Sequence, residues 1–200
     1  MKTSNTIIGV GLSIVLFCCA LSAQEPKAPS ASQSPNLRKL SIQSLEAGDT
    51  KSAIKYAGEW LSKTTNAQAY YYGDVVHDAN QIIGLAALKD GRMADAKLYL
   101  LKAGATPGSP RLMSSGPNMV LAQKLLDGDQ KEAVVQYLDL VAKFWAHTSD
   151  ERLRKAEEKM PGSSEVLKRS NKQHQEQIDR WKIQIQAGEK PSLNNSKSLA

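Results

Sequence analysis

The sequence predicts an all-α protein, and three observations support this prediction. Apolar residues recur at helical spacing over most of the chain between residues 37 and 187. Short breaks rich in Gly, Asp, Asn or Pro interrupt this spacing and mark helix ends. No segment combines the alternating Val, Ile and Thr residues of a strand with the turn residues of a hairpin, so we expect no sheet. The expected helices cover residues 37–47, 50–63, 67–89, 93–103, 117–126, 132–145, 150–160 and 165–187.

The first four expected helices form two hairpins. Leucines at helical spacing define residues 37–47, and alanines and a tryptophan share one face of residues 50–63. Residues 67–89 begin near three consecutive tyrosines at 70–72, of which at least one must face outward because neighbouring helical residues lie about 100° apart. The clearest hairpin spans residues 82–103, where small residues lie at the expected helix contact and larger apolar residues flank them.

The remaining elements are a third hairpin and a polar C-terminal part. Residues 104–116 are rich in Pro, Gly and Ser and are expected to be an irregular loop. Residues 117–126 and 132–145 form the third hairpin, with a break at Asp127-Gly128-Asp129. Charged helices are expected in residues 147–188, followed by a disordered tail over residues 189–200.

The N-terminus has the layout of a secretory signal peptide. A single early charge, Lys2, precedes an apolar run over residues 7–21, which is short for a membrane span of about 20 residues. Small residues follow the run, so we expect a signal peptide over residues 1–23 that is cleaved after Ala23, with Ala20 or Ser22 as alternative positions. Residues 24–35 contain three prolines and no large apolar side chain, and they are expected to be a flexible linker. The protein is therefore predicted to be exported, either to a periplasm or to the medium.

Both cysteines lie within the apolar run. After cleavage at Ala23 the mature chain would contain no thiol and would fold by packing alone, without disulfides. Lipid modification of Cys18 or Cys19 is an alternative, but the bulky Phe17 is unlike the small residues that precede a lipid-modified cysteine.

Three predicted turns share a spacing. Gly48, Gly91 and Gly128 are each followed five residues later by an alanine. Glycine permits the sharp reversal between two helices, and alanine one turn later allows their axes to approach closely. The glycines recur at intervals of about 40 residues, and a helix pair with such a period is typical of a helical-repeat protein.

The residues of the second hairpin resemble a tetratricopeptide repeat. The resemblance depends on Ile83, Gly84, Ala87, Gly91, Met93, Ala96, Leu100 and Ala103. The first and third units match mainly from the turn onward. This resemblance implies a right-handed stack of antiparallel helix pairs over residues 36–146, with extra C-terminal helices over residues 147–188. It also implies a scaffold that binds a protein or peptide in a groove lined by the first helix of each pair. The side chains at groove positions would be those of Arg38, Asp78, Gln81 and Asn118.

A second resemblance concerns the C-terminal half. Residues 116–122, Phe144-Trp145, Trp181 and residues 187–191 are similar to the corresponding segments of an uncharacterised group of exported bacterial tetratricopeptide-like proteins. In this chain a charged stretch over residues 149–177 separates the Phe-Trp pair from the last tryptophan helix. The group has no established activity to transfer.

Charge and motifs argue against nucleic-acid binding and catalysis. The net charge is +6, but the 26 basic and 20 acidic residues are interspersed rather than gathered in a basic patch. His77, His147 and His174 lack partners at metal-ligand spacing, and no phosphate-binding loop or nucleophile motif occurs. His77 and Asp78 are adjacent, so on a helix they are expected to point in different directions and not to form one site. We expect no catalytic, cofactor or metal site.

The sequence therefore predicts an exported scaffold that binds a protein or peptide partner and is not an enzyme. The alternative is a structural envelope protein that forms a homo-oligomer through its last helix. The narrow apolar stripe of that helix, Ile178, Trp181 and Ile185, would supply the contact seam.

Overall fold

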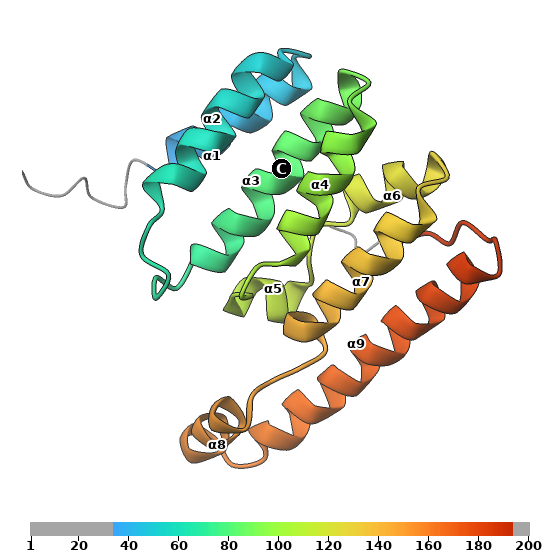
Figure 1. The fold of residues 1–200 in the computed structure, drawn as a ribbon. Helices are drawn as coiled ribbons and strands as arrows, with labels where there is room; N and C mark the ends of the chain where they lie inside the picture. The colour runs from blue at the N-terminus through green and yellow to red at the C-terminus, as the bar shows by residue number, and fades with distance from the viewer. Residues whose placement is uncertain (1–33, 194–200) are drawn as a thin grey trace, which may run out of the picture. The chain divides into compact units, whose positions relative to one another are not determined.

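The computed structural model describes residues 34–193, and these form nine α-helices and no strand (Figure 1). The all-α prediction is confirmed for this part of the chain. The signal peptide, its cleavage after Ala23, both cysteines and nearly all of the linker lie outside the described residues. Within residues 34–193 no helix is both long enough and apolar enough to cross a membrane. The helices are α1 (Ser34–Glu46), α2 (Thr50–Lys63), α3 (Tyr72–Lys89), α4 (Met93–Gly104), α5 (Pro110–Ser115), α6 (Val120–Asp127), α7 (Lys131–Trp145), α8 (Asp150–Lys159) and α9 (Ser163–Gln186).

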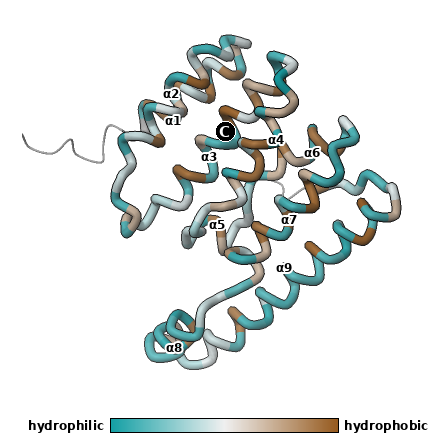
Figure 2. The backbone as a smooth tube through the Cα atoms, viewed as in Figure 1, coloured by the Kyte–Doolittle hydropathy of each residue, from teal (hydrophilic) through white to brown (hydrophobic). Residues whose placement is uncertain are grey.

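Helices that follow one another through a short turn pack against each other. α1 packs on α2, α3 on α4, and α6 on α7, while α2 also contacts α3, and α4 contacts α7. The first helices of these pairs also meet, because α3 contacts both α1 and α6. Apolar segments are frequent along α3, α4 and α7, whereas α8 is mostly hydrophilic and has no buried residue (Figure 2).

The turns after α1 and α3 have the same backbone geometry. Gly48 and Gly91 have φ angles of 81° and 74°, in the left-handed region that glycine adopts without a steric cost. The following residue in each turn donates its N–H to a carbonyl five residues earlier, Asp49 to Ser44 and Arg92 to Ala87, both at 2.9 Å. This pattern closes the helix by satisfying carbonyls that would otherwise lack partners.

In the third turn the left-handed residue is Asp129 rather than the predicted glycine. Asp129 has a φ angle of 63°, whereas Gly128 has a φ angle of −83°. The N–H of Gln130 donates to the carbonyl of Leu125 at 2.8 Å, so this turn closes in the same way one residue later. All three predicted glycines lie at interhelical turns, but Gly128 does not supply the reversal.

This shift changes which residues are equivalent in the three pairs. Counted from the left-handed residue, the counterpart of Ala53 and Ala96 is Val134, not Ala133. Ala53, Ala96 and Val134 are all 0% exposed, whereas Ala133 retains 8%. The third pair therefore places a valine where the first two place alanine.

The predicted irregular loop contains a short helix, α5. Ser109 accepts a hydrogen bond from the N–H of Leu112 at 3.0 Å and so caps α5, and Pro110 occupies its first turn. The loop before α5 lies against the start of α3, where Thr106 donates to the carbonyl of Gly73 at 2.8 Å. Three helix starts differ from prediction by three or more residues: α1 begins at Ser34 rather than residue 37, α3 at Tyr72 rather than residue 67, and α6 at Val120 rather than residue 117.

The tyrosines before α3 behave as expected. Tyr70 and Tyr71 are exposed, with 74% and 38% of their surfaces accessible, so at least one tyrosine of the triplet faces outward. Neither lies in the body of a helix, because α3 begins only at Tyr72.

Glu157 joins α8 to α9. Its carboxylate accepts the N–H of Gly162 at 2.8 Å and the N–H of Ser164 at 3.0 Å, next to the positive end of the α9 dipole. The Gly162 bond, followed by those from Ser164, lowers the pKa of Glu157 to about 2. Since α8 has no buried residue, these hydrogen bonds join it to the start of α9 without support from a buried side chain of α8.

The C-terminal segment packs on the helices instead of forming a free tail from residue 189. Ile178, Trp181 and Ile185 are buried, and α9 packs against α7. After α9 the chain folds back: the indole N–H of Trp181 donates to the carbonyl of Ser192 at 3.1 Å, and Leu193 is completely buried. The expectation of a disordered tail is thus wrong for residues 189–193, and residues 194–200 lie outside the described part. We call residues 189–193 the C-terminal strap.

Candidate functional site

The four predicted groove residues belong to one polar network. Arg38 on α1 faces Asp78 on α3, with 3.6 Å between Nε and Oδ2. Gln81 on α3 donates to the hydroxyl of Tyr137 at 3.4 Å, and this hydroxyl donates to the backbone carbonyl of Asn118 at 3.3 Å. The structure therefore brings together residues that the sequence placed on three separate helices or helix starts.

Asp78 is the centre of the network. It is 3% exposed, and its carboxylate accepts hydrogen bonds from Nδ1 of His77 at 2.9 Å and from one terminal nitrogen of Arg111, which lies 3.1 Å from each oxygen. Burial alone would raise the pKa of Asp78, but the hydrogen bond from His77 and the charges of His77, Arg111 and Arg38 outweigh it, so the pKa is lowered. Asp78 is thus a buried carboxylate that stays ionised.

Arg111 connects α5 to α3. Besides Asp78 it contacts Asp74, with 3.0 Å between Nε and Oδ1, and the hydroxyl of Ser109 donates to the same Asp74 oxygen. Sequence reasoning missed Arg111 because it treated residues 104–116 as an irregular loop. The available signal was Ser109-Pro110, a helix cap followed by a first-turn proline, which would have predicted α5 and placed Arg111 on it.

Asp78, His77 and Tyr137 are connected in series. Nε2 of His77 lies 3.3 Å from the hydroxyl of Tyr137, and Nδ1 of the same ring contacts Asp78. The expectation that His77 and Asp78 could not form one unit is therefore wrong, because both side chains are long enough to meet although their Cβ atoms point in different directions. The His77 ring is also completely buried, with an exposure of 0%.

The order Tyr137, His77, Asp78 resembles the nucleophile, base and acid of a catalytic triad, but a substrate cannot reach the Tyr137 hydroxyl. Tyr137 is completely buried, and burial, followed by the nearby charge of Asp78, raises the pKa of its hydroxyl. A protonated phenol without a path to solvent cannot act as a nucleophile. The network instead links α1, α3, α5 and α7 through one set of polar contacts.

Burial also decides which of the four predicted residues could meet a ligand. Asp78, Gln81 and Asn118 are at most 6% exposed, so they support the helices from inside. Arg38 keeps 37% of its side chain accessible, and Arg111 keeps 41%. Arg38, Asp78 and Gln81 lie on the predicted helices, whereas Asn118 lies just before α6, and the positions of the four residues are mostly interior.

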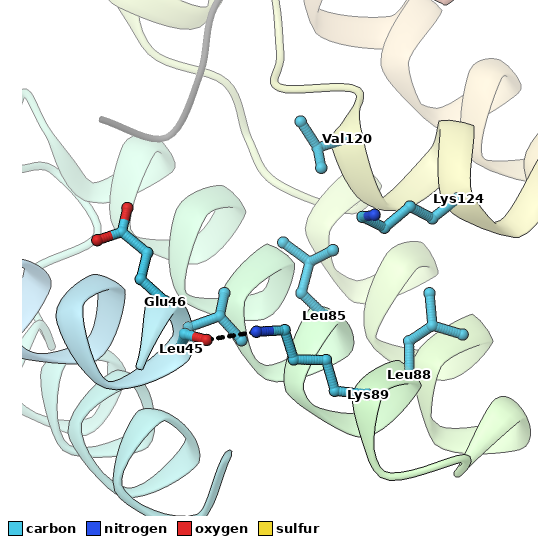
Figure 3. A pocket seen from close by; sticks show the side chains of 7 residues that line it. All are labelled: Leu45, Glu46, Leu85, Leu88, Lys89, Val120 and Lys124. Carbon is cyan, nitrogen blue, oxygen red and sulfur yellow. Dashed lines mark hydrogen bonds between the residues drawn. The ribbon is translucent and has the colours of Figure 1, made fainter. Parts of the chain in front are cut away.

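An open pocket lies farther along the same helices. Leu45 is seven residues after Arg38, and Leu85 is seven residues after Asp78, which is two helical turns or about 10 Å of axial rise. The pocket lies between α1, α3 and α6 and has a volume of about 310 Å³. Its lining comprises Leu45, Glu46, Leu85, Leu88, Lys89, Val120 and Lys124 (Figure 3).

The three charged residues at the pocket have different roles. The ammonium of Lys89 donates to the carbonyl of Leu45 at 2.6 Å, so it satisfies the C-terminal end of α1 (Figure 3). The carboxylate of Glu46 and the ammonium of Lys124 have no hydrogen-bond or ion-pair partner within residues 34–193. They lie on opposite sides of the apolar floor, one from α1 and the other from α6 (Figure 3). The pocket can therefore bury an apolar group and pair with charges of both signs.

The other histidines do not join this region. His147 is exposed after α7, and Nδ1 of His174 lies 2.8 Å from the carbonyl of Trp145, on whose ring it stacks with 4.3 Å between centroids. Among the described residues, no group of three or more His, Cys, Asp or Glu side chains is arranged to hold a metal ion.

Comparisons of the chain with protein-family models, with curated proteins and with solved structures found no match. The residues and geometry described above are therefore the basis for any functional proposal.

Proposed function

We propose that this chain is an exported scaffold of tetratricopeptide-like helix pairs that binds a protein or peptide partner and has no catalytic activity. One observation carries the proposal: the first helix of each of the three pairs, α1, α3 and α6, contributes to a single open apolar pocket. A binding surface of this kind needs apolar contact area and accessible charges, and both occur here.

Two further observations support it. The turns of the three pairs close through the same hydrogen-bond pattern, as expected when a chain repeats one structural unit. Three side chains of types that often take part in catalysis are buried and engaged in contacts inside the protein, namely His77, Asp78 and Tyr137. The residues that line the pocket are mostly apolar.

A peptide-display experiment tests binding at the pocket. A random peptide library is selected on the purified protein, and the affinities of selected peptides are then measured for the wild type, Val120→Asp and Leu98→Asp. Val120 borders the pocket and is 36% exposed, while Leu98 on α4 is 48% exposed and lies outside it, so neither change disturbs the core. We expect Val120→Asp to weaken binding at least about tenfold, because a charge replaces apolar contact area. Leu98→Asp should bind as the wild type does.

The proposal fails if no peptide is enriched, or if every enriched peptide binds Val120→Asp and wild type equally well. Export is tested separately by expressing the full chain in a bacterial host and determining the mass of the product. Loss of residues 1–23 supports export, and an intact chain retained in the cytoplasm contradicts it.

A further inference from the structure

We infer that the pocket between α1, α3 and α6 selects a partner segment in which one bulky apolar side chain lies between an acidic and a basic residue. This inference rests on the proposed function and specifies the chemistry of the partner. It follows from the size of the pocket and from the arrangement of the charges around it.

The size of the pocket limits the apolar part of the ligand. A volume of about 310 Å³ is near the lower end of ligand sites, which run from about 300 to 1,000 Å³. Leu45, Leu85, Leu88 and Val120 surround it with aliphatic surface. Such a site holds one large aliphatic or aromatic side chain of an exposed segment, not a whole helix face.

The charges at the edge of the pocket determine which residues on either side of the bound apolar side chain are favourable. Lys89 is already engaged with the carbonyl of Leu45, so the accessible charges are the Lys124 ammonium on the α6 side and the Glu46 carboxylate on the α1 side. Figure 3 shows the Glu46 and Lys124 side chains apart from each other at the pocket. A segment with an acidic residue near Lys124 and a basic residue near Glu46 would form two favourable ion pairs. A segment with two charges of the same sign gains one pair and suffers one repulsion.

The same charges argue against the chain's own C-terminal segment as the occupant. The hydrogen bond from the Leu193 N–H to the side chain of Gln123 places the end of the strap on α6. The residues that follow, 194–200, contain one lysine and no acidic residue. Their side chains could pair with Glu46 but include no carboxylate for Lys124, so a separate segment whose side chains carry charges of both signs fits better.

Four synthetic peptides with blocked ends test the inference by fluorescence polarisation. Three contain a central leucine, with glutamate and lysine, two glutamates, or two lysines as flanking residues, and the fourth replaces the leucine of the mixed peptide with alanine. We expect wild type to bind the mixed peptide about twofold to fivefold more tightly than either like-charged peptide, as exposed ion pairs contribute modestly. The alanine peptide should bind at least about tenfold more weakly than its leucine counterpart.

Reversing a charge at the pocket should change which of the leucine peptides binds most tightly. Lys124→Glu should shift the preference to the two-lysine peptide, and Glu46→Lys should shift it to the two-glutamate peptide. The double variant should again prefer the mixed peptide. Lys143→Glu is the control, because Lys143 is exposed on α7 outside the pocket, and it should keep the preference of the wild type.

The outcomes separate this inference from the proposed function. Equal affinity of the wild type for the three leucine peptides overturns the inference, even if display-selected peptides bind the pocket and support the function. Preferences that do not follow the reversed charges overturn it as well. A variant that ends at Leu193 and binds the mixed peptide at least about tenfold more tightly than the full chain identifies residues 194–200 as the occupant. A dimer that Lys124→Glu dissociates identifies a second copy, and either result overturns the assignment to a separate partner.

Discussion

Replacing Gly73 by alanine should destabilise the protein strongly, because the loop before α5 crosses the start of α3 at this residue. A Cβ atom on Gly73 would lie 1.9 Å from the carbonyl oxygen of Gly108 and 2.4 Å from its carbonyl carbon. Both are backbone atoms, so the contact cannot be relieved by a side-chain rotation. The loop also has little room to withdraw, because the far side of Gly108 faces Phe144, whose Cβ would lie 2.8 Å from an added methyl group.

The expected change in the free energy of unfolding combines two destabilising contributions and one stabilising contribution. Overpacking a close contact costs about 1–3 kcal/mol. Displacement of the loop also breaks the hydrogen bond from Thr106 to the Gly73 carbonyl, which contributes about 1 kcal/mol. Alanine is a better helix former than glycine by about 1 kcal/mol in a helix interior, and by less in a first turn. We therefore expect Gly73→Ala to lower the free energy of unfolding by about 2 kcal/mol.

Gly58 provides a matched control. It lies within α2, and an added Cβ would have no neighbour within 4 Å among the described residues, so Gly58→Ala should stabilise the protein by about 0.5–1 kcal/mol. Both variants are compared with wild type by urea unfolding, followed by circular dichroism at the helical band. A midpoint for Gly73→Ala at or above that of wild type would refute the close approach of the loop to α3.

Three other changes test separate features of the fold. Asp78→Asn should lower the free energy of unfolding by about 2 kcal/mol at pH 7, as hydrogen bonds to charged groups contribute about that much. The pKa of Asp78 is lowered, so its contribution is full above the ordinary value of 3.8 and is lost as the pH falls through the folded-state pKa; the urea midpoints of variant and wild type should therefore approach each other as the pH is lowered below 3.8. Glu157→Gln should accelerate amide hydrogen exchange at the start of α9 at pH 7, whereas Glu158→Gln should not. In the wild type, the stabilisation by the Glu157 carboxylate is complete above the unfolded pKa of 4.5 and is lost as the pH falls through the folded pKa of about 2, so the same local opening should appear in that range. Gly91→Ala should lower the free energy of unfolding by about 1–2 kcal/mol, because Gly91 has a φ angle of 74°. Gly128→Ala should leave it unchanged or raise it, because Gly128 has a φ angle of −83°. An equal loss of stability in both variants would contradict the one-residue shift of the third turn.

Helical spacing and turn residues were sufficient to predict the all-α class and the positions of most helices among the described residues. The helix pairs on either side of Gly48 and Gly91 form as expected, because their glycines can adopt the left-handed conformation that closes the turn. The third turn was assigned one residue too early, because Asp129 adopts that conformation although its neighbour is a glycine. Aspartate is among the few residues that tolerate it, and a local sequence pattern does not decide between two adjacent candidates.

The candidate site was harder to predict because its contacts are long-range. The sequence placed Asp78 on the face shared by the first helices, but its burial depends on Arg111, which is 33 residues away, and on the side chain of Arg38. Helical periodicity indicates which face of α3 meets its neighbours, but it does not say how deeply each turn of that face is covered. The open part of the face, near Leu85, could be located only once the positions of α1 and α6 were known.

The C-terminal strap has a consequence for the order in which the protein is assembled during synthesis. The hydrogen bond between Leu193 and Gln123 connects residues 70 positions apart, and a ribosome adding about 5–20 residues per second needs about 4–14 s to produce that length. During this interval the nascent α6 carries an amide side chain and a neighbouring apolar surface whose partners have not yet been translated. The contact between Leu193 and α6 can therefore form only after all the other described residues have been synthesised, and a stop codon shortly before Leu193 would leave this part of α6 uncovered.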